Sequence, residues 1–154
     1  MSVHNNGAAM LKSVLGIRVQ RATAVLPATT QTAIFTIGTG RVIVTSLIGT
    51  FTVAGSATAT TLKITGNPTA GTDVDLATAT AVTSKEVGSI ITLPAALGGA
   101  VTVANAGGTT VPIGSGLILN PGTLDIVTSA TNTGSVKWDL TYVPLDDGAV
   151  VTAA

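Results

Sequence analysis

Residues 136–143 have the sequence VKWDLTYV, in which apolar and polar side chains alternate from Val136 to Tyr142. Successive side chains of a β-strand point to opposite faces of its sheet, so this segment predicts a strand with one apolar and one polar face. The apolar face is predicted to lie in the core and consists of Val136, Trp138, Leu140 and Tyr142. The polar face consists of Ser135, Lys137, Asp139 and Thr141. Because a slip of one residue would expose Trp138, the register of this strand is strongly specified.

Residues 124–129 are predicted to pair with this strand in a hairpin whose loop is 130–134. Similar segments precede them at a spacing of about ten residues, separated by Gly, Pro and Asn. They predict strands at 17–26, 32–37, 41–53, 58–65, 74–82, 90–93, 101–104 and 111–119, with turns at 66–71 and 120–122 and an exposed loop at 84–88. Strand 41–53 is apolar on both faces, which is typical of a strand covered from two sides.

No persuasive helical period accompanies these strands, and helix is confined to a predicted turn within residues 8–15. About eight to ten strands predict an all-β chain, folded as a two-sheet antiparallel β-sandwich and most simply as a jelly roll. A length of 154 residues fits one domain. We therefore expect an N-terminal arm at 1–16, a β-sandwich domain at 17–145 and a C-terminal tail at 146–154.

Threonine supplies most of the polarity of the chain, which holds 28 Thr but only seven basic and seven acidic residues. Charged residues make up 9% of it, against roughly a quarter in an ordinary soluble domain. The formal net charge is +0, so little electrostatic repulsion keeps copies apart. We expect a surface that is covered by other copies of the chain or by a larger assembly, and hence a structural role.

The same composition argues against several other classes of protein. The chain has no Cys, which excludes a disulfide scaffold, a thiolate metal site and a cysteine nucleophile. Its basic residues are scattered singly, so we expect no nucleic-acid partner. No segment is predominantly apolar over the roughly 20 residues that a membrane-spanning helix needs, and no signal peptide is expected near the N-terminus. We expect synthesis and assembly in a cytoplasm.

Two acidic pairs and one imidazole are candidates for chemistry. Asp73 and Asp75 place two carboxylates on one face of a predicted strand, about 7 Å apart, where calcium could use them; calcium needs six to eight oxygens, so solvated charges beside a turn are the favoured interpretation. Asp146 and Asp147 are adjacent and cannot flank a scissile bond, which favours a turn or a solubilising terminus. His4 lies in the predicted arm, so a catalytic triad would need it to fold back. We expect no cofactor and no enzyme.

Two glycine pairs and two aromatic residues also have alternative interpretations. Gly38-Thr39-Gly40 and Gly114-Ser115-Gly116 resemble phosphate-binding loops, but no helix is predicted after either one, so both are interpreted as turns or bends. Trp138 and Tyr142 could form a platform that stacks on a sugar. Aromatic residues make up only 3% of the chain, and these two share the predicted core face, so core packing is favoured.

Apolar residues at helical spacing mark a candidate partner interface near the N-terminus, formed by Met10, Leu11, Val14 and Leu15. A short apolar patch with little charge gains most by docking into a groove of a neighbour. Terminal residues are, however, usually frayed unless something holds them. An interacting arm and a frayed terminus both remain open.

The threonine-rich strands, residues 66–76 (GNPTAGTDVDL) and residues 136–145 (VKWDLTYVPL) together resemble small virion structural proteins of tailed bacteriophages, in particular capsid decoration, or cement, proteins. The resemblance covers residues 17–150 and includes no diagnostic motif. It implies β-sandwich subunits that form homotrimers on the outer surface of the head and clamp adjacent major capsid proteins, in some members through a terminal arm. It implies no catalytic residues, and it implies assembly in the cytoplasm of a bacterial host.

Two rival functions remain open beside a decoration protein. The first is another virion component, such as a tail, tail-tube or head-fibre subunit; a tube protein would form hexameric rings. The second is a carbohydrate-binding module that attaches a virion to its host. Copy number and response to glycans would distinguish these alternatives.

Overall fold

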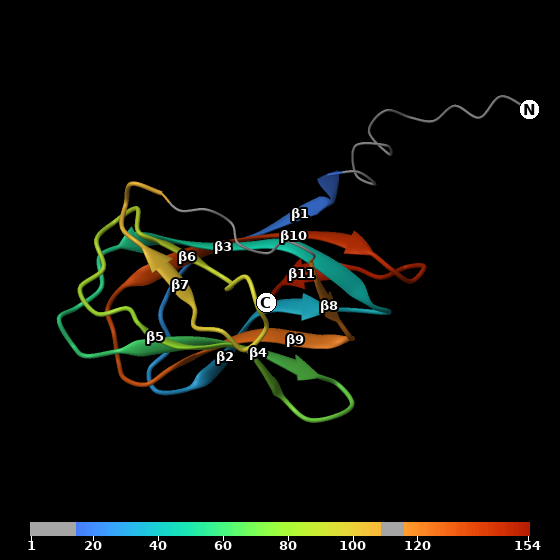
Figure 1. Cartoon of the computed structure of the whole chain (residues 1–154), viewed down its shortest axis with the longest axis horizontal. Coiled ribbons are helices and arrows are strands. Elements are labelled where there is room, and N and C mark those ends of the chain that lie inside the picture. The colour runs from blue at the N-terminus through green and yellow to red at the C-terminus, as the bar shows by residue number, and fades with distance from the viewer. Residues whose placement is uncertain (1–14, 109–115) are drawn as a thin grey trace, which may run out of the picture.

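Two antiparallel sheets contain all eleven strands in a computed structural model of the chain, which describes residues 15–108 and 116–154 (Figure 1). We name them sheets A and B. In order, sheet A consists of β1 (Ile17–Val25), β10 (Ser135–Pro144), β3 (Val42–Val53), β6 (Ile90–Thr92) and β7 (Thr102–Ala104), and β8 (Leu117–Leu119) also pairs with β3. Sheet B consists of β11 (Val151–Ala153), β2 (Gln31–Ile37), β9 (Gly122–Thr128), β4 (Thr61–Pro68) and β5 (Val74–Ala81). The predicted all-β fold with two antiparallel sheets is confirmed.

The hydrophobic core lies between the two sheets, which form the two layers seen in Figure 1. Strand β10 is central to sheet A because it pairs with β1 on one side and with β3 on the other. Its four alternating apolar residues are all buried, with at most 3% of any of them exposed: Val136, Trp138, Leu140 and Tyr142. Sheet B contributes side chains of the same kind from its inner face, including Phe35, Leu62, Ile64, Leu124 and Ile126. Removing this apolar surface from water is the main force that holds the sheets together.

The chain repeatedly crosses from one sheet to the other. Strands β1 to β4 alternate between sheets A and B, and so do β8 to β11. The predicted hairpin of residues 124–129 and 136–143 is therefore wrong, because β9 pairs with β2 and β4 whereas β10 pairs with β1 and β3. The loop after β9 is an arch between the sheets, held by Asn132, whose side-chain oxygen accepts hydrogen bonds from the backbone N–H groups of Ser56 and Gly134.

Two element boundaries also differ from expectation. Strand β4 continues through Gly66, Asn67 and Pro68, which were predicted to begin a turn, because these residues pair with Leu124, Thr123 and Gly122 of β9. Pro68 is the last residue of β4, a position where its missing N–H group does little damage to the ladder. Residues 146–154 were predicted to form a tail but end in β11, which extends sheet B by pairing with β2. The sandwich therefore reaches the last residues of the chain.

The predicted arm lies outside the described ranges except for its last residues, and so does most of the predicted strand 111–119, of which β8 is the described part. None of the described residues forms a helix with the length and apolar character needed to cross a bilayer.

Candidate functional site

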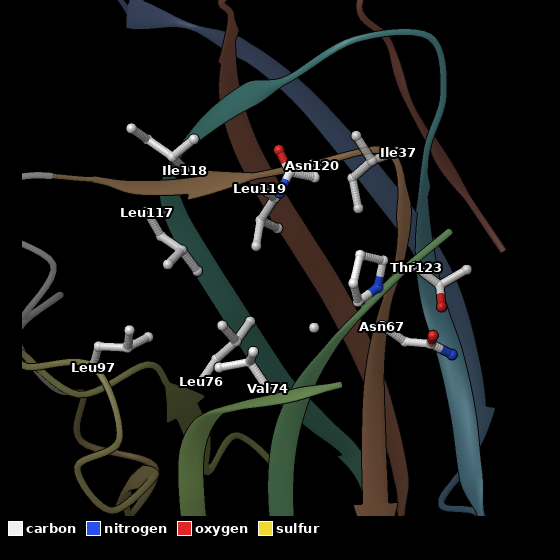
Figure 2. A pocket seen from close by; sticks show the side chains of 12 residues that line it. Ile37, Asn67, Val74, Leu76, Leu97, Leu117, Ile118, Leu119, Asn120 and Thr123 are labelled. Atoms are coloured by element: carbon white, nitrogen blue, oxygen red, sulfur yellow. The ribbon is translucent and has the colours of Figure 1, made fainter. Parts of the chain in front are cut away.

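An apolar groove with a cavity volume of about 170 Å³ opens at one end of the sandwich (Figure 2). One wall is β8 of sheet A, and the other is the end of the β4–β5 hairpin of sheet B. We call it the end groove. Its lining residues are Ile37, Gly66, Asn67, Pro68, Val74, Leu76, Leu97, Leu117, Ile118, Leu119, Asn120 and Thr123.

Strand alternation explains why this end of the molecule exposes apolar side chains. Strand β8 pairs through Leu117–Leu119 with Val44–Val42 of β3, so Leu119 points into the core while Ile118 points outward and is 61% exposed. Leu97 (65% exposed) and Val74 (49% exposed) complete the apolar rim. A smaller hollow of about 70 Å³ adjoins the end groove and shares Leu97 with it. Exposed apolar side chains that gather around a hollow are typical of an interaction surface rather than of a bare protein surface.

The lining of the end groove is suited to packing against a partner. The polar side chains of its lining are two amides and one hydroxyl, from Asn67, Asn120 and Thr123, and none of the described lining residues is titratable. Its volume is below the roughly 300–1,000 Å³ typical of small-molecule sites. The groove can therefore bury apolar side chains of a partner, with the amides on its rim available for hydrogen bonds.

The end groove lies at the end of sheet A where the chain enters the sandwich. The register places Ile17, Tyr142, Val44 and Leu117 in one row across β1, β10, β3 and β8. Three interstrand spacings of about 4.8 Å therefore separate the start of β1 from the wall of the groove. Leu15, the one residue of the predicted interface that the structure describes, is 67% exposed at this end. Met10, Leu11, Val14 and His4 lie outside the described residues.

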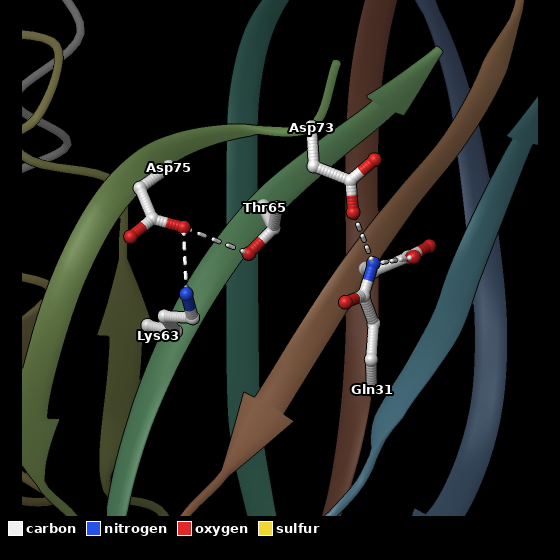
Figure 3. A network of polar contacts seen from close by, with 6 residues as sticks. Gln31, Lys63, Thr65, Asp73 and Asp75 are labelled. Atoms are coloured by element: carbon white, nitrogen blue, oxygen red, sulfur yellow. Dashed lines mark hydrogen bonds and ion pairs between the residues drawn. The ribbon is translucent and has the colours of Figure 1, made fainter. Parts of the chain in front are cut away.

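Asp73 and Asp75, the predicted metal candidates, are held apart by different partners (Figure 3). Asp75 Oδ1 lies 2.8 Å from Lys63 Nζ and also accepts a hydrogen bond from the Thr65 hydroxyl. Asp73 precedes β5, and its Oδ2 accepts a hydrogen bond from Gln31 Nε2. No group of three or more His, Cys, Asp or Glu side chains suited to a metal occurs among the described residues. The two carboxylates therefore have separate hydrogen-bond partners, and both residues are exposed.

A third carboxylate, Asp125, was missed by sequence reasoning. Its neighbours along β9, Leu124 and Ile126, point into the core, so Asp125 projects from the outer face of sheet B. It is nevertheless only 3% exposed. Its Oδ2 accepts hydrogen bonds from Gln31 Nε2 at 2.7 Å and from Asn67 Nδ2 at 3.4 Å. Its Oδ1 is buried and has no hydrogen-bond partner. No local pattern signals this burial, since both amides come from other strands.

Asp146 forms a forked ion pair with Arg41 at the start of β3. The Arg41 side chain donates to both carboxylate oxygens, from Nε at 3.0 Å and from Nη2 at 2.9 Å, and the Arg41 backbone N–H donates at 2.8 Å. These hydrogen bonds lower the pKa of Asp146 to about 2. Gly40 makes the approach possible, because its φ is +95° and a Cβ there would come within 2.8 Å of the Asp146 Cβ. Asp146 thus fixes a turn, one of the two roles predicted for it.

The remaining candidates have structural surroundings. Trp138 and Tyr142 are buried, so their rings do not form an exposed platform for a sugar. Residues 38–40 lie in the connection between β2 and β3. Gly114 and Ser115 lie outside the described residues, and Gly116 leads directly into β8.

Comparison of the chain with protein-family models, with curated proteins and with solved structures finds no match in any of the three.

Proposed function

We propose that the chain is a structural virion protein, a homotrimeric decoration protein that binds the outer surface of a phage head and clamps adjacent major capsid subunits. The observation that carries the proposal is the end groove. It offers an apolar contact surface at the end of the sandwich where the described chain begins with Leu15, and the sequence before Leu15 includes the apolar Met10, Leu11 and Val14. An exposed apolar groove and a sequence with further apolar residues to bury suit contacts between identical subunits.

The low charge of the surface supports the same role. The described residues form three ion pairs, Arg18–Asp139, Arg41–Asp146 and Lys63–Asp75, and each links neighbouring strands or loops of the sandwich. These pairs neutralise six of the few charges that the surface carries, which leaves threonine hydroxyls and methyl groups as its main chemistry. Such side chains lose less rotamer entropy than Lys or Glu when a partner covers them. On a shell, many modest contacts of this kind reinforce one another.

The strand order supports the finer fold assignment that belongs to this proposal. Alternation of consecutive strands between two facing sheets is expected for a jelly roll, an architecture common in viral capsid proteins. In this proposal the partners are sibling chains and a major capsid protein, and the protein is located on the outer surface of the virion after assembly in the host cytoplasm.

Two measurements on the purified full chain test the proposal. Light scattering is expected to give the mass of three chains, and the protein is expected to co-sediment with heads assembled without it and to raise the temperature at which they disrupt. Hexameric rings would favour a tail-tube subunit instead. A single copy that does not bind such heads would refute the proposal.

A further inference from the structure

The outer face of sheet B carries an excess of negative charge around a buried carboxylate. Lys63 is the only Lys or Arg in the strands of this sheet, and it is paired with Asp75. Neither Asp125 nor Asp73 has a cationic partner among the described residues. A buried carboxylate is costly unless hydrogen bonds or a positive charge compensate it. Amide groups alone compensate Asp125, and they reach only one of its two oxygens.

The geometry around Gln31 shows where a positive charge would fit (Figure 3). Gln31 Nε2 lies 2.7 Å from Asp125 Oδ2 and 3.1 Å from Asp73 Oδ2, so one amide nitrogen bridges two carboxylates. The nitrogen is the positive end of the amide dipole, and it occupies the point between the two oxygens. Gln31 is exposed, so its amide can withdraw from this point. Calcium lies about 2.3–2.6 Å from its oxygen ligands, so that withdrawal, with a small inward movement of both carboxylates, would let a cation take the vacated position.

We propose that Asp73 and Asp125, with Gln31 and Asn67, form a binding site for a hard divalent cation on the outer face of sheet B. Each amide also carries a carbonyl oxygen, and an amide that has withdrawn and rotated would present that oxygen to the ion. Two carboxylates, two amide oxygens and water then supply an all-oxygen set of the kind that calcium uses. The unpartnered Oδ1 belongs to the same carboxylate of Asp125, so a cation at Oδ2 would also offset the cost of burying that charge.

The site differs from Asp73 and Asp75, the weak candidates considered from sequence, and does not depend on the proposed function. Asp73 is retained, but its partner is Asp125, 52 positions further along the chain, rather than Asp75. An ion held there would link β2, β4 and β9 to the segment before β5, and would therefore stabilise sheet B. With only two carboxylates, the affinity is expected to be weak, with a Kd on the order of 10⁻⁴–10⁻³ M.

Calorimetric titration of the chelator-treated full chain with calcium chloride tests the site, together with thermal unfolding at low and millimolar calcium. We expect one ion per chain and a rise in Tm with calcium concentration. Asp73→Asn changes an exposed residue, so the chain should fold, and it is expected to weaken binding about tenfold or more. Asp125→Asn is expected to abolish binding, but Asp125 is buried and the variant can fail to fold, so the Asp73 variant carries the test.

Asp75→Asn is the matched control. It removes the same charge two residues away, but from a carboxylate that is bonded to Lys63 and Thr65. At an ionic strength of about 0.15 M, screening limits its effect through space, and Kd is expected to change less than about threefold. The proposal is overturned if the wild-type chain shows neither heat nor a Tm change at millimolar calcium. Equal weakening by the Asp73 and Asp75 variants would also overturn it, because it would indicate a diffuse ion atmosphere.

Discussion

The six-membered ring of Trp138 on β10 lies against Gly49, its paired residue on β3. A Cβ atom at Gly49 would come within 2.8 Å of Cζ3 and 2.9 Å of Cη2 of the ring. Trp138 is 1% exposed and is the largest of the fully buried side chains. The ring therefore occupies the space that a side chain at position 49 would need, so packing requires the glycine at the centre of sheet A.

Gly49→Ala is expected to destabilise the fold by about 1–3 kcal/mol, because the added methyl group overpacks the core against an aromatic ring. Urea unfolding followed by fluorescence measures this directly, since Trp138 is the only tryptophan. Gly66→Ala is the matched control in strand β4. A Cβ there would meet Leu76 at an ordinary 3.5 Å, so its stability should change by no more than about 1 kcal/mol. Equal losses in the two variants would show that the Trp138 contact is not the cause.

The Arg41–Asp146 pair gives the stability a defined pH dependence. Hydrogen bonds from Arg41 lower the pKa of Asp146 from 3.8 to about 2, so the folded chain binds this proton less readily than the unfolded chain. The stabilisation is therefore fully present above about pH 4 and is lost as the pH falls toward about 2. We expect Asp146→Asn to be less stable than wild type at neutral pH, with the difference disappearing across this acidic range.

Asp147→Asn provides the control for that experiment. Asp147 is the adjacent residue, loses the same charge and makes no ion pair with any described residue. Thermal unfolding should show that the difference in Tm between wild type and Asp146→Asn narrows from pH 7 to pH 2. Asp147→Asn should show no comparable difference from wild type. A Tm difference between wild type and Asp146→Asn that stays constant below pH 4 would show that the Arg41–Asp146 ion pair is not its cause.

The parts of the fold that were predictable are those encoded by neighbouring residues. The alternation of residues 136–143 was sufficient to place Trp138 and Tyr142 on a core face. The pairing of strands was not predictable in the same way, because a loop such as 130–134 can close a hairpin within a sheet or arch between two sheets. Asn132 favours the arch through its hydrogen bond to Ser56, a residue distant in sequence.

The candidate sites depended still more on distant contacts. Alternation places Asp125 on the outer face of its strand, where exposure is the natural expectation; its burial comes from Gln31 and Asn67 on two other strands. Strand β11 has only three residues, too few for a periodic signal, and it exists because Val151 pairs with Ile37. The end groove likewise requires β8 and β5 to be brought together, which no single segment specifies.

The end groove predicts that an exposed apolar residue can be changed without harming the fold. Ile118→Lys places a charge on the rim of the groove, where solvent can hydrate it in the isolated sandwich. The free energy of unfolding should therefore change by no more than about 0.5 kcal/mol. Covering that lysine with an apolar partner would bury an unpaired charge, so trimer formation or binding to heads should weaken by about tenfold or more. Light scattering and co-sedimentation measure the two effects.

Val87→Lys is the control for the groove, since Val87 is similarly exposed but lies at the other end of β3. Its neighbour Gly88 donates a backbone hydrogen bond to Phe51, whereas β8 pairs with Val42–Val44. It should assemble and bind as the wild-type chain does. If both variants assemble normally, the end groove is not the contact surface.

The N-terminal residues provide an independent test of the same contact. Fourteen residues precede Leu15, and an extended chain spans up to about 3.3–3.6 Å per residue, or about 50 Å in all. That length exceeds the three interstrand spacings of about 4.8 Å between the start of β1 and the groove wall. Replacing Leu11 and Val14 together by Ser is expected to leave the Tm of the sandwich unchanged and to weaken assembly, because the apolar anchors are lost. The matched control replaces Asn5 and Asn6 by Ser in the same segment, which removes no apolar surface. Normal assembly of the Leu11 and Val14 variant would exclude an interacting arm and would leave the groove to bind a different partner surface.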